Sequence, residues 1–303
     1  MVALASLLAV AAAIAIALGT RSSGGAAPAQ PPPPAFVRLE LGGTTVARAK
    51  VDSMRRPAAF AAALQALPSQ RVARVGRARI TYAVDQAATA AALHQALRQG
   101  GGTVTAIEHP IASTITVPLI KQRLRDDCEA TALSMVLGYA GRPVDQLQLQ
   151  REVAHAKPLD PTTGANGEEV WGDPSLGFVG RADGGGPAGG FGVYQGPIRA
   201  LAQSHGLAMT DLTGRSPNRV YAALLAGHPV LAWVALSPGP FASWASPAGR
   251  TIRINWGEHA VVLTGLAAGT IAVNDPLSGE RLSWTTSQFE SMWAGLGHRA
   301  LAA

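Results

Sequence analysis

The order of helical and strand patterns in residues 116–303 constrains the fold of this chain most. The helices expected there lie at 128–140, 145–156, 197–206 and 216–227. The strands expected after them lie at 229–236, 259–266, 270–275 and 281–285, and a last helix is expected from Thr286 onward. Helices followed by an antiparallel run of strands are typical of an α+β domain, in which a helical half packs on a sheet half. A cleft between the two halves is a natural place for chemistry.

Two segments of this domain are expected to be less regular. Residues 117–120 resemble a short strand that leads into a loop. Residues 157–196 are rich in Gly, Pro and Asp, so little regular structure is expected there. Because a loop of that length inside a compact domain is usually functional or disordered, we expect residues 160–195 to shape a substrate cleft.

Residues 36–115 are expected to form a separate, small α+β module. Its expected elements are two strands around a Gly42-Gly43 turn, helices at 57–67 and 85–101, and strands at 78–84 and 103–109. Asp85 stands where it can cap the second helix. The module carries no catalytic constellation, so it is interpreted as a spacer, a docking module or a propeptide.

The first residues of the chain predict export. Residues 2–18 are uncharged and almost wholly apolar. At about 1.5 Å per residue, a helix over them reaches the lower limit for spanning a bilayer. We interpret 1–21 as a signal anchor or signal peptide, and 22–35, with four consecutive prolines, as a linker. The protein is therefore expected to be extracytoplasmic, membrane-anchored or secreted, with the membrane and the cell wall as potential contacts.

Composition and missing motifs exclude several classes of protein. The 303 residues include one cysteine, so an intramolecular disulfide and a zinc site with several thiolates are impossible. The net charge of +6 is mild, and no basic cluster is interleaved with aromatics, so nucleic-acid binding is not expected. The sequence has no HExxH or GxSxG motif, which disfavours a metal hydrolase and a serine hydrolase. No metal and no cofactor are expected.

The single cysteine is either a buried apolar residue or a functional thiol, and its position favours the second. Cys128 begins a predicted helix, and Asp126 and Asp127 stand where a helix cap belongs. Free N–H groups and the helix dipole favour negative charge there, so a lowered thiol pKa is expected. The two aspartates oppose this effect, so a protonated histidine is expected nearby.

His259 and Asp275 are the candidates to act on that thiol. His259 starts one predicted strand, and Asp275 ends the next. Because antiparallel neighbours joined at 267–269 bring these two ends together, the side chains are expected to meet. A carboxylate that accepts the Nδ1–H of the imidazole would fix its tautomer and stabilise the imidazolium. Taken alone, His259 could be an exposed residue at a strand edge and Asp275 a turn residue before Pro276.

Acyl transfer also needs hydrogen-bond donors for the oxyanion. Gln122 lies six residues before Cys128, in the loop that enters the helix. Its amide could act beside the backbone N–H of Cys128. Without the other candidates, Gln122 would be read as a solvated loop residue.

Four stretches in the same order resemble cysteine peptidase family thirty-nine, the group of the bacteriocin-processing double-glycine leader peptidases, and in particular its exported stand-alone branch. They are Val117–Gln122 with Asp127–Thr131 and Gly138–Gly141, the glycine-rich pieces Gly172–Pro174, Gly177–Gly180 and Gly192–Tyr194, then Trp256–Val262, and Val273–Pro276. The resemblance covers about 116–303.

This resemblance implies a papain-like fold with Cys128, His259 and Asp275 as a catalytic triad and Gln122 in the oxyanion hole. The implied activity is hydrolysis of peptide bonds in a peptide or protein. Glu129 departs from the leader peptidases, which have glycine there, so cleavage after a double glycine is not assumed. Two alternatives stay open: an acyl-transfer or amidase enzyme of the same fold that acts on cell-wall peptides, and a non-catalytic module that binds peptide or wall.

Overall fold

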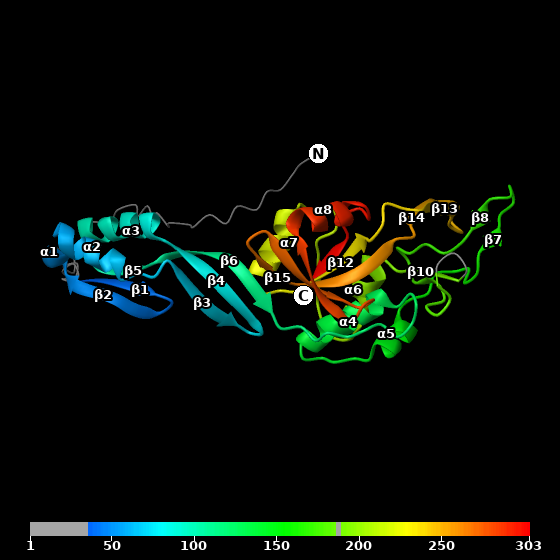
Figure 1. Cartoon of the computed structure of the whole chain (residues 1–303), viewed down its shortest axis with the longest axis horizontal. Coiled ribbons are helices and arrows are strands. Elements are labelled where there is room, and N and C mark those ends of the chain that lie inside the picture. Colours follow the sequence, from blue (N-terminus) through cyan, green and yellow to red (C-terminus); the bar gives the residue numbers. More distant parts are fainter. Residues whose placement is uncertain (1–35, 186–188) are drawn as a thin grey trace, which may run out of the picture.

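The computed structural model describes residues 36–185 and 189–303 (Figure 1). The segments interpreted as signal and linker, 1–21 and 22–35, lie outside the described residues. Within the described ranges, every helix is too short or too polar to cross a bilayer.

The N-terminal module has the expected mixture of helices and strands. Its elements are β1 (Phe36–Leu41), β2 (Thr44–Lys50), α1 (Val51–Met54), α2 (Pro57–Gln65), β3 (Gln70–Val75), β4 (Ala78–Asp85), α3 (Gln86–Arg98), β5 (Gly102–Thr105) and β6 (Ile107–Ile115). A small sheet of order β2-β1-β5 packs against the helices around its own apolar core, which includes Leu39 and Leu93. The predicted cap is confirmed, since the Asp85 carboxylate accepts a hydrogen bond from the Ala88 N–H at 2.8 Å.

Strands β3, β4 and β6 leave this module and extend the main sheet of the second domain (Figure 1). β6 pairs with the last part of β15 (Glu258–Ala267), with Thr114 opposite Gly265. Ala78, Ile80 and Ile115 belong to the apolar core of the second domain. The sheet therefore crosses the boundary expected between residues 115 and 116.

The second domain contains the expected helices followed by strands. Its helices are α4 (Cys128–Tyr139), α5 (Gln146–Glu152), α6 (Gln195–Ser204), α7 (Pro217–Leu225) and α8 (Thr286–Ala294). Its main strands are β11 (Thr210–Asp211), β12 (Val230–Ala235), β15, β16 (Thr270–Asp275), β17 (Glu280–Thr285) and β18 (Ala300–Ala302). The mixed helix and sheet architecture confirms the α+β prediction.

β15 is the centre of a nine-stranded sheet. Seven of the strands follow the order β11-β18-β12-β15-β6-β4-β3, and β16 and β17 form a branch from β15. One edge of β15 pairs first with β12 and then with β6, while the other edge pairs with β16. Helix α4 packs against β15 and is buried from Cys128 through Leu137. Because α4 is buried on all sides, both the start of the helix and the start of β15 are held by the core.

Three local expectations are wrong. Residues 117–120 are not a strand, because their backbone is held by a side chain: Asn274 Nδ2 donates to the carbonyl of Pro118 at 3.0 Å. Helix α5 ends at Glu152 instead of 156, because the backbone of residues 154–156 bonds to Phe178 instead. The strands β13 (Phe241–Ala245), β14 (Thr251–Asn255) and β18 were not expected at all.

The long irregular segment is confirmed, and its described residues contain only short strands: β7 (Thr162–Thr163), β8 (Glu169–Val170), β9 (Val179–Gly180) and β10 (Gly190–Gly192). Contacts between two tryptophans hold this segment against the β13–β14 hairpin. Trp171 and Trp244 pack with ring centroids 5.2 Å apart, and the Trp244 indole N–H donates to the Gly172 carbonyl at 2.7 Å.

Candidate active site

Cys128 is the first residue of α4, as predicted, but the expected helix cap is not formed. Asp127 occupies the cap position without a hydrogen bond to the helix. Its Oδ1 instead accepts from the Leu124 N–H at 3.1 Å, inside the preceding loop. Asp126 accepts from the Gly185 N–H at 2.9 Å and so joins this loop to the glycine-rich segment. Asp127 therefore does not cap α4 as predicted.

His259 and Asp275 meet at the start of β15 and the end of β16. His259 Nε2 lies 2.6 Å from Asp275 Oδ1, and both side chains are buried. The hairpin geometry expected from the sequence is thus present, but the nitrogen differs: Nε2 contacts the carboxylate, where Nδ1 was expected. Nδ1 is therefore the nitrogen that remains available to other partners.

Asp275 is held as an anion by its surroundings. Burial is the largest single effect and would raise its pKa, but the contact with His259 and the hydrogen bonds from Ser278 and Leu277 together hold the pKa well below its usual range. The N–H groups of Leu277 and Ser278 also donate to the carboxylate, at 2.9 and 3.1 Å. An ionised Asp275 can orient the imidazole and stabilise a positive charge on it.

A single cavity of about 230 Å³ brings the candidate residues together. Gln122, Cys128 and His259 all line it, and Asp275 lies behind His259. The other lining residues are Arg125, Asp126, Gly190, Phe191, Leu236, Trp256, Gly257, Glu258 and Leu277. The cavity thus combines a helix-borne thiol, a strand-borne imidazole and an aromatic wall.

The Gln122 amide reaches this cavity, but its donors are directed elsewhere. Its Nε2 donates to the backbone carbonyls of Leu124 and Arg125, at 3.1 and 2.8 Å. Its Oε1 is buried and has no hydrogen-bond partner among the described residues. The amide would have to turn before it could donate to an oxyanion.

The pKa of the Cys128 thiol is raised, contrary to the expectation of a lowered pKa. Burial raises the pKa of Cys128 well above its ordinary value, and the Glu129 and Glu258 carboxyls raise it further. The start of a helix favours a thiolate, but here loss of water and nearby negative charge have the larger effect.

Glu129 and Glu258 form a buried acidic pair beside the thiol. Burial raises the pKa of Glu129 to about 7, and burial together with Glu129 raises the pKa of Glu258 well above its ordinary value. Glu129 bridges two elements: it accepts from the Val193 N–H at 2.6 Å and lies 3.4 Å from the Cys128 sulfur. The Oε1 atom of Glu258 is buried without a hydrogen-bond partner.

This pair was not predicted as part of the site. The available signals were that Glu129 directly follows the nucleophile candidate and that Glu258 directly precedes His259. One potential ligand atom from each of Cys128, Glu129 and Glu258 lies within 4.8 Å of the others, which is close enough for a shared cation. The Glu129 and Glu258 carboxyls can also lie this close without a metal, because bound protons remove their mutual repulsion.

An α+β fold with a cysteine at the start of its buried helix and a histidine–aspartate pair on the facing sheet defines the papain-like class. The chain belongs to the Peptidase_C39 like family, whose model matches residues 114–301. Membership in this family indicates a cysteine peptidase that acts on a peptide or protein.

Two relatives support the family assignment. The uncharacterized protein YvpB of Bacillus subtilis strain 168 is 37% identical over 185 residues, which is 59% of this chain and 69% of YvpB. The crystal structure of a Bacillus anthracis protein, provisionally assigned as a C39-like peptidase, is 31% identical. It aligns with a TM-score of 0.53 over 62% of this chain and 94% of that one.

Proposed function

We propose that this protein is an extracytoplasmic cysteine peptidase that hydrolyses peptide bonds with Cys128 as nucleophile, His259 as base and Asp275 as the residue that orients the histidine. One observation supports this most strongly: His259, whose Nε2 lies 2.6 Å from Asp275 Oδ1, lines the same cavity as Cys128. A buried carboxylate that binds one imidazole nitrogen leaves the other to exchange a proton with a nucleophile.

In the proposed reaction, His259 takes the thiol proton at Nδ1, and the sulfur attacks the peptide carbonyl carbon. Asp275 stabilises the imidazolium through Nε2–H. The imidazolium then protonates the departing amine, which leaves an acyl group on Cys128. A water molecule, deprotonated by His259, attacks the thioester and releases the acid and the free thiol.

The oxyanion would be stabilised at the start of α4. The backbone N–H of Cys128 belongs to the first turn of the helix, where N–H groups lack an intrahelical acceptor. Gln122 would supply a second donor once its amide turns away from the Leu124 and Arg125 carbonyls. Two donors of this kind are the usual means of stabilising a tetrahedral acyl-transfer intermediate.

Burial of Cys128, together with the Glu129 and Glu258 carboxyls, raises the thiol pKa and makes the free enzyme a resting state with a protonated thiol. The thiolate would then form mainly when substrate fills the cavity and His259 accepts the proton. The apolar residues 2–18 and the linker that follows them support the extracytoplasmic part of the proposal.

The test is hydrolysis of an unfolded protein by the purified chain, with product ends identified by mass spectrometry. Cys128→Ala and His259→Ala are expected to abolish cleavage. His205→Ala is the matched control, since His205 Nε2 also lies 2.6 Å from a carboxylate, that of Glu152, outside the cavity. Cleavage that persists in folded Cys128→Ala would contradict the proposal, and products joined to an added amine would indicate acyl transfer.

A further inference from the structure

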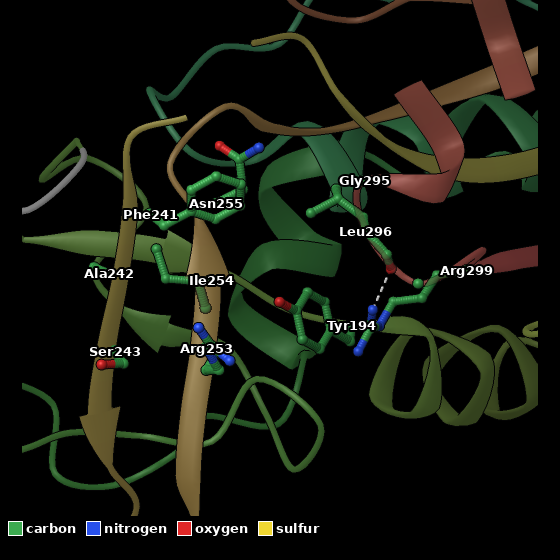
Figure 2. Close-up of a pocket in the computed structure, with 11 residues that line it drawn as sticks. Tyr194, Phe241, Ala242, Ser243, Arg253, Ile254, Asn255, Gly295, Leu296 and Arg299 are labelled. Carbon is green, nitrogen blue, oxygen red and sulfur yellow. Dashed lines mark hydrogen bonds between the residues drawn. The ribbon is translucent and has the colours of Figure 1, made fainter. Parts of the chain in front are cut away.

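A second cavity, of about 480 Å³, lies beside the catalytic one and has no role in the proposed reaction (Figure 2). We call it the arginine cavity. The β13–β14 hairpin and the loop between α8 and β18 form it, and its lining residues include Tyr194, Phe241, Arg253, Ile254, Leu296 and Arg299. Its volume lies within the range of about 300–1,000 Å³ that is common for ligand pockets.

The arginine cavity offers hydrogen-bond donors that the described residues leave partly unpaired. Tyr194 is only 5% exposed, yet its hydroxyl forms no hydrogen bond with a described residue. Figure 2 shows this hydroxyl turned toward β14, where Arg253 and Ile254 lie. Burial raises the pKa of Tyr194 well above its ordinary range, so the hydroxyl remains a donor.

The guanidinium groups of Arg253 and Arg299 are the other hydrogen-bond donors of the arginine cavity. The exposed Arg253 forms no ion pair with a described carboxylate. Arg299 stacks on Tyr194, with its guanidinium carbon 3.8 Å from the ring centroid, and one of its N–H groups donates to the Leu296 carbonyl (Figure 2). The Nε of Arg299 is buried and has no partner among the described residues.

No lining residue of the arginine cavity in the described chain is acidic. The Asn255 amide does not compete for a ligand, because it already donates to the Ser237 carbonyl and accepts from the Gly257 N–H. A ligand here must therefore bring acceptors, and a carboxylate matches guanidinium and hydroxyl donors best. The side chains of Phe241, Ile254 and Leu296 add apolar surface for a neighbouring group.

The two cavities share a wall. Phe191 lines the catalytic cavity and packs edge-on against Tyr194 of the arginine cavity, with ring centroids 5.8 Å apart. Asn255 lines one cavity, and its chain neighbour Trp256 lines the other. The two cavities are therefore adjacent, within reach of one bound peptide.

We propose that the arginine cavity is a substrate subsite that binds a peptide carboxylate, either the chain terminus or an acidic side chain, next to an apolar group. This inference rests on the proposed peptidase function, because it assigns the cavity to the same substrate.

The test measures binding to the full chain carrying Cys128→Ala, so that no turnover is required. The probes are an acetylated pentapeptide ending in Phe with a free carboxylate, the same peptide as its amide, and an amidated version with Glu before the Phe. Isothermal calorimetry is expected to show that the free acid binds about tenfold more tightly than the plain amide. Arg253→Gln and Tyr194→Phe are expected to remove most of this difference.

Arg219→Gln is the matched control, because Arg219 is exposed on α7 and lies outside both cavities. It is expected to keep the preference. If the amidated Glu peptide binds as tightly as the free acid, the site accepts side-chain carboxylates. If it binds as weakly as the plain amide, the site requires the carboxylate of the chain terminus. Either result supports the subsite.

Equal binding of acid and plain amide, or a preference that survives Arg253→Gln and Tyr194→Phe, would overturn the inference. So would inorganic phosphate that displaces the free acid at equal concentration, since it would indicate a general anion site. A carboxylate preference, combined with a wild-type chain that cleaves no peptide, would refute the proposed function and leave a carboxylate-binding site of another role.

Discussion

His259 Nε2 and Asp275 Oδ1 lie 2.6 Å apart, although 16 positions separate the two residues in the chain. The β15–β16 hairpin produces this contact, and burial protects it from solvent. Since Asp275 is ionised in this setting, it fixes which imidazole nitrogen faces the catalytic cavity.

Asp275→Asn tests this relationship. The amide keeps the shape of the side chain but removes the charge and can hold the imidazole in the wrong tautomer. We expect kcat for peptide hydrolysis to fall by at least about 10²-fold, with KM nearly unchanged. Steady-state kinetics, with circular dichroism to confirm folding, would measure this. A folded variant with undiminished kcat would show that Asp275 is only a turn residue.

Gly192→Ala tests the close packing around Glu129. Gly192 has φ +131°, and a Cβ there would lie 2.4 Å from Glu129 Oε1. We expect a loss of about 1–3 kcal/mol or more in the free energy of unfolding. Gly249→Ala is the control, since Gly249 has φ +75° and no atom within 4 Å of a new Cβ. An equal loss in both variants, measured by urea unfolding, would show that contact with Glu129 is unimportant.

The acidic pair predicts an unusual pH dependence of thiol reactivity. Because only the thiolate is alkylated, a raised thiol pKa moves the alkylation profile of Cys128 to higher pH. Glu129 and Glu258 raise the thiol pKa only where their carboxyls are ionised, so in that pH range Glu129→Gln and Glu258→Gln should each shift the alkylation profile to lower pH. Rates followed by mass spectrometry would measure this. A shift to higher pH, or none in either variant, would contradict the proposed resting state.

The continuous sheet predicts how the chain tolerates truncation. A chain that starts at residue 116 lacks β6, so part of the β15 edge is uncovered and Ile80 and Ile115 are lost from the core. We expect a lower melting temperature and a tendency to aggregate. A chain that starts at residue 70 keeps β3, β4 and β6 and serves as the control. Equal melting temperatures of the two chains would show that strands β3, β4 and β6 do not support the sheet that carries His259.

Local sequence patterns were sufficient to predict much of the fold. Helix α4 was predicted from its apolar repeat, α3 from its Asp85 cap, and the meeting of His259 and Asp275 from antiparallel pairing alone. In each case the deciding interactions lie within one element or between two consecutive ones. Cys128 could also be placed, because it begins a helix with a clear apolar pattern.

The features that the sequence did not predict depend on long-range interactions. The thiol pKa depends on burial and on Glu258, which is 130 positions away in the chain from Cys128, so the helix start alone predicted the wrong direction. The imidazole nitrogen that faces Asp275 depends on how the ring sits in the cavity, which no sequence pattern encodes. Likewise, the β6–β15 pairing joins segments about 150 residues apart, and nothing local in residues 107–115 indicates it.

The most direct test of the proposed triad is covalent labelling of the purified chain with a peptide that carries a thiol-directed acyloxymethyl ketone, followed by tryptic mapping. Such a probe reacts when an imidazole presents a thiolate to a bound peptide. The proposed Cys128–His259–Asp275 triad predicts labelling at Cys128 that is lost in His259→Ala and kept in His205→Ala. Labelling that proceeds equally well in His259→Ala, or no labelling of the folded wild-type chain, would contradict it.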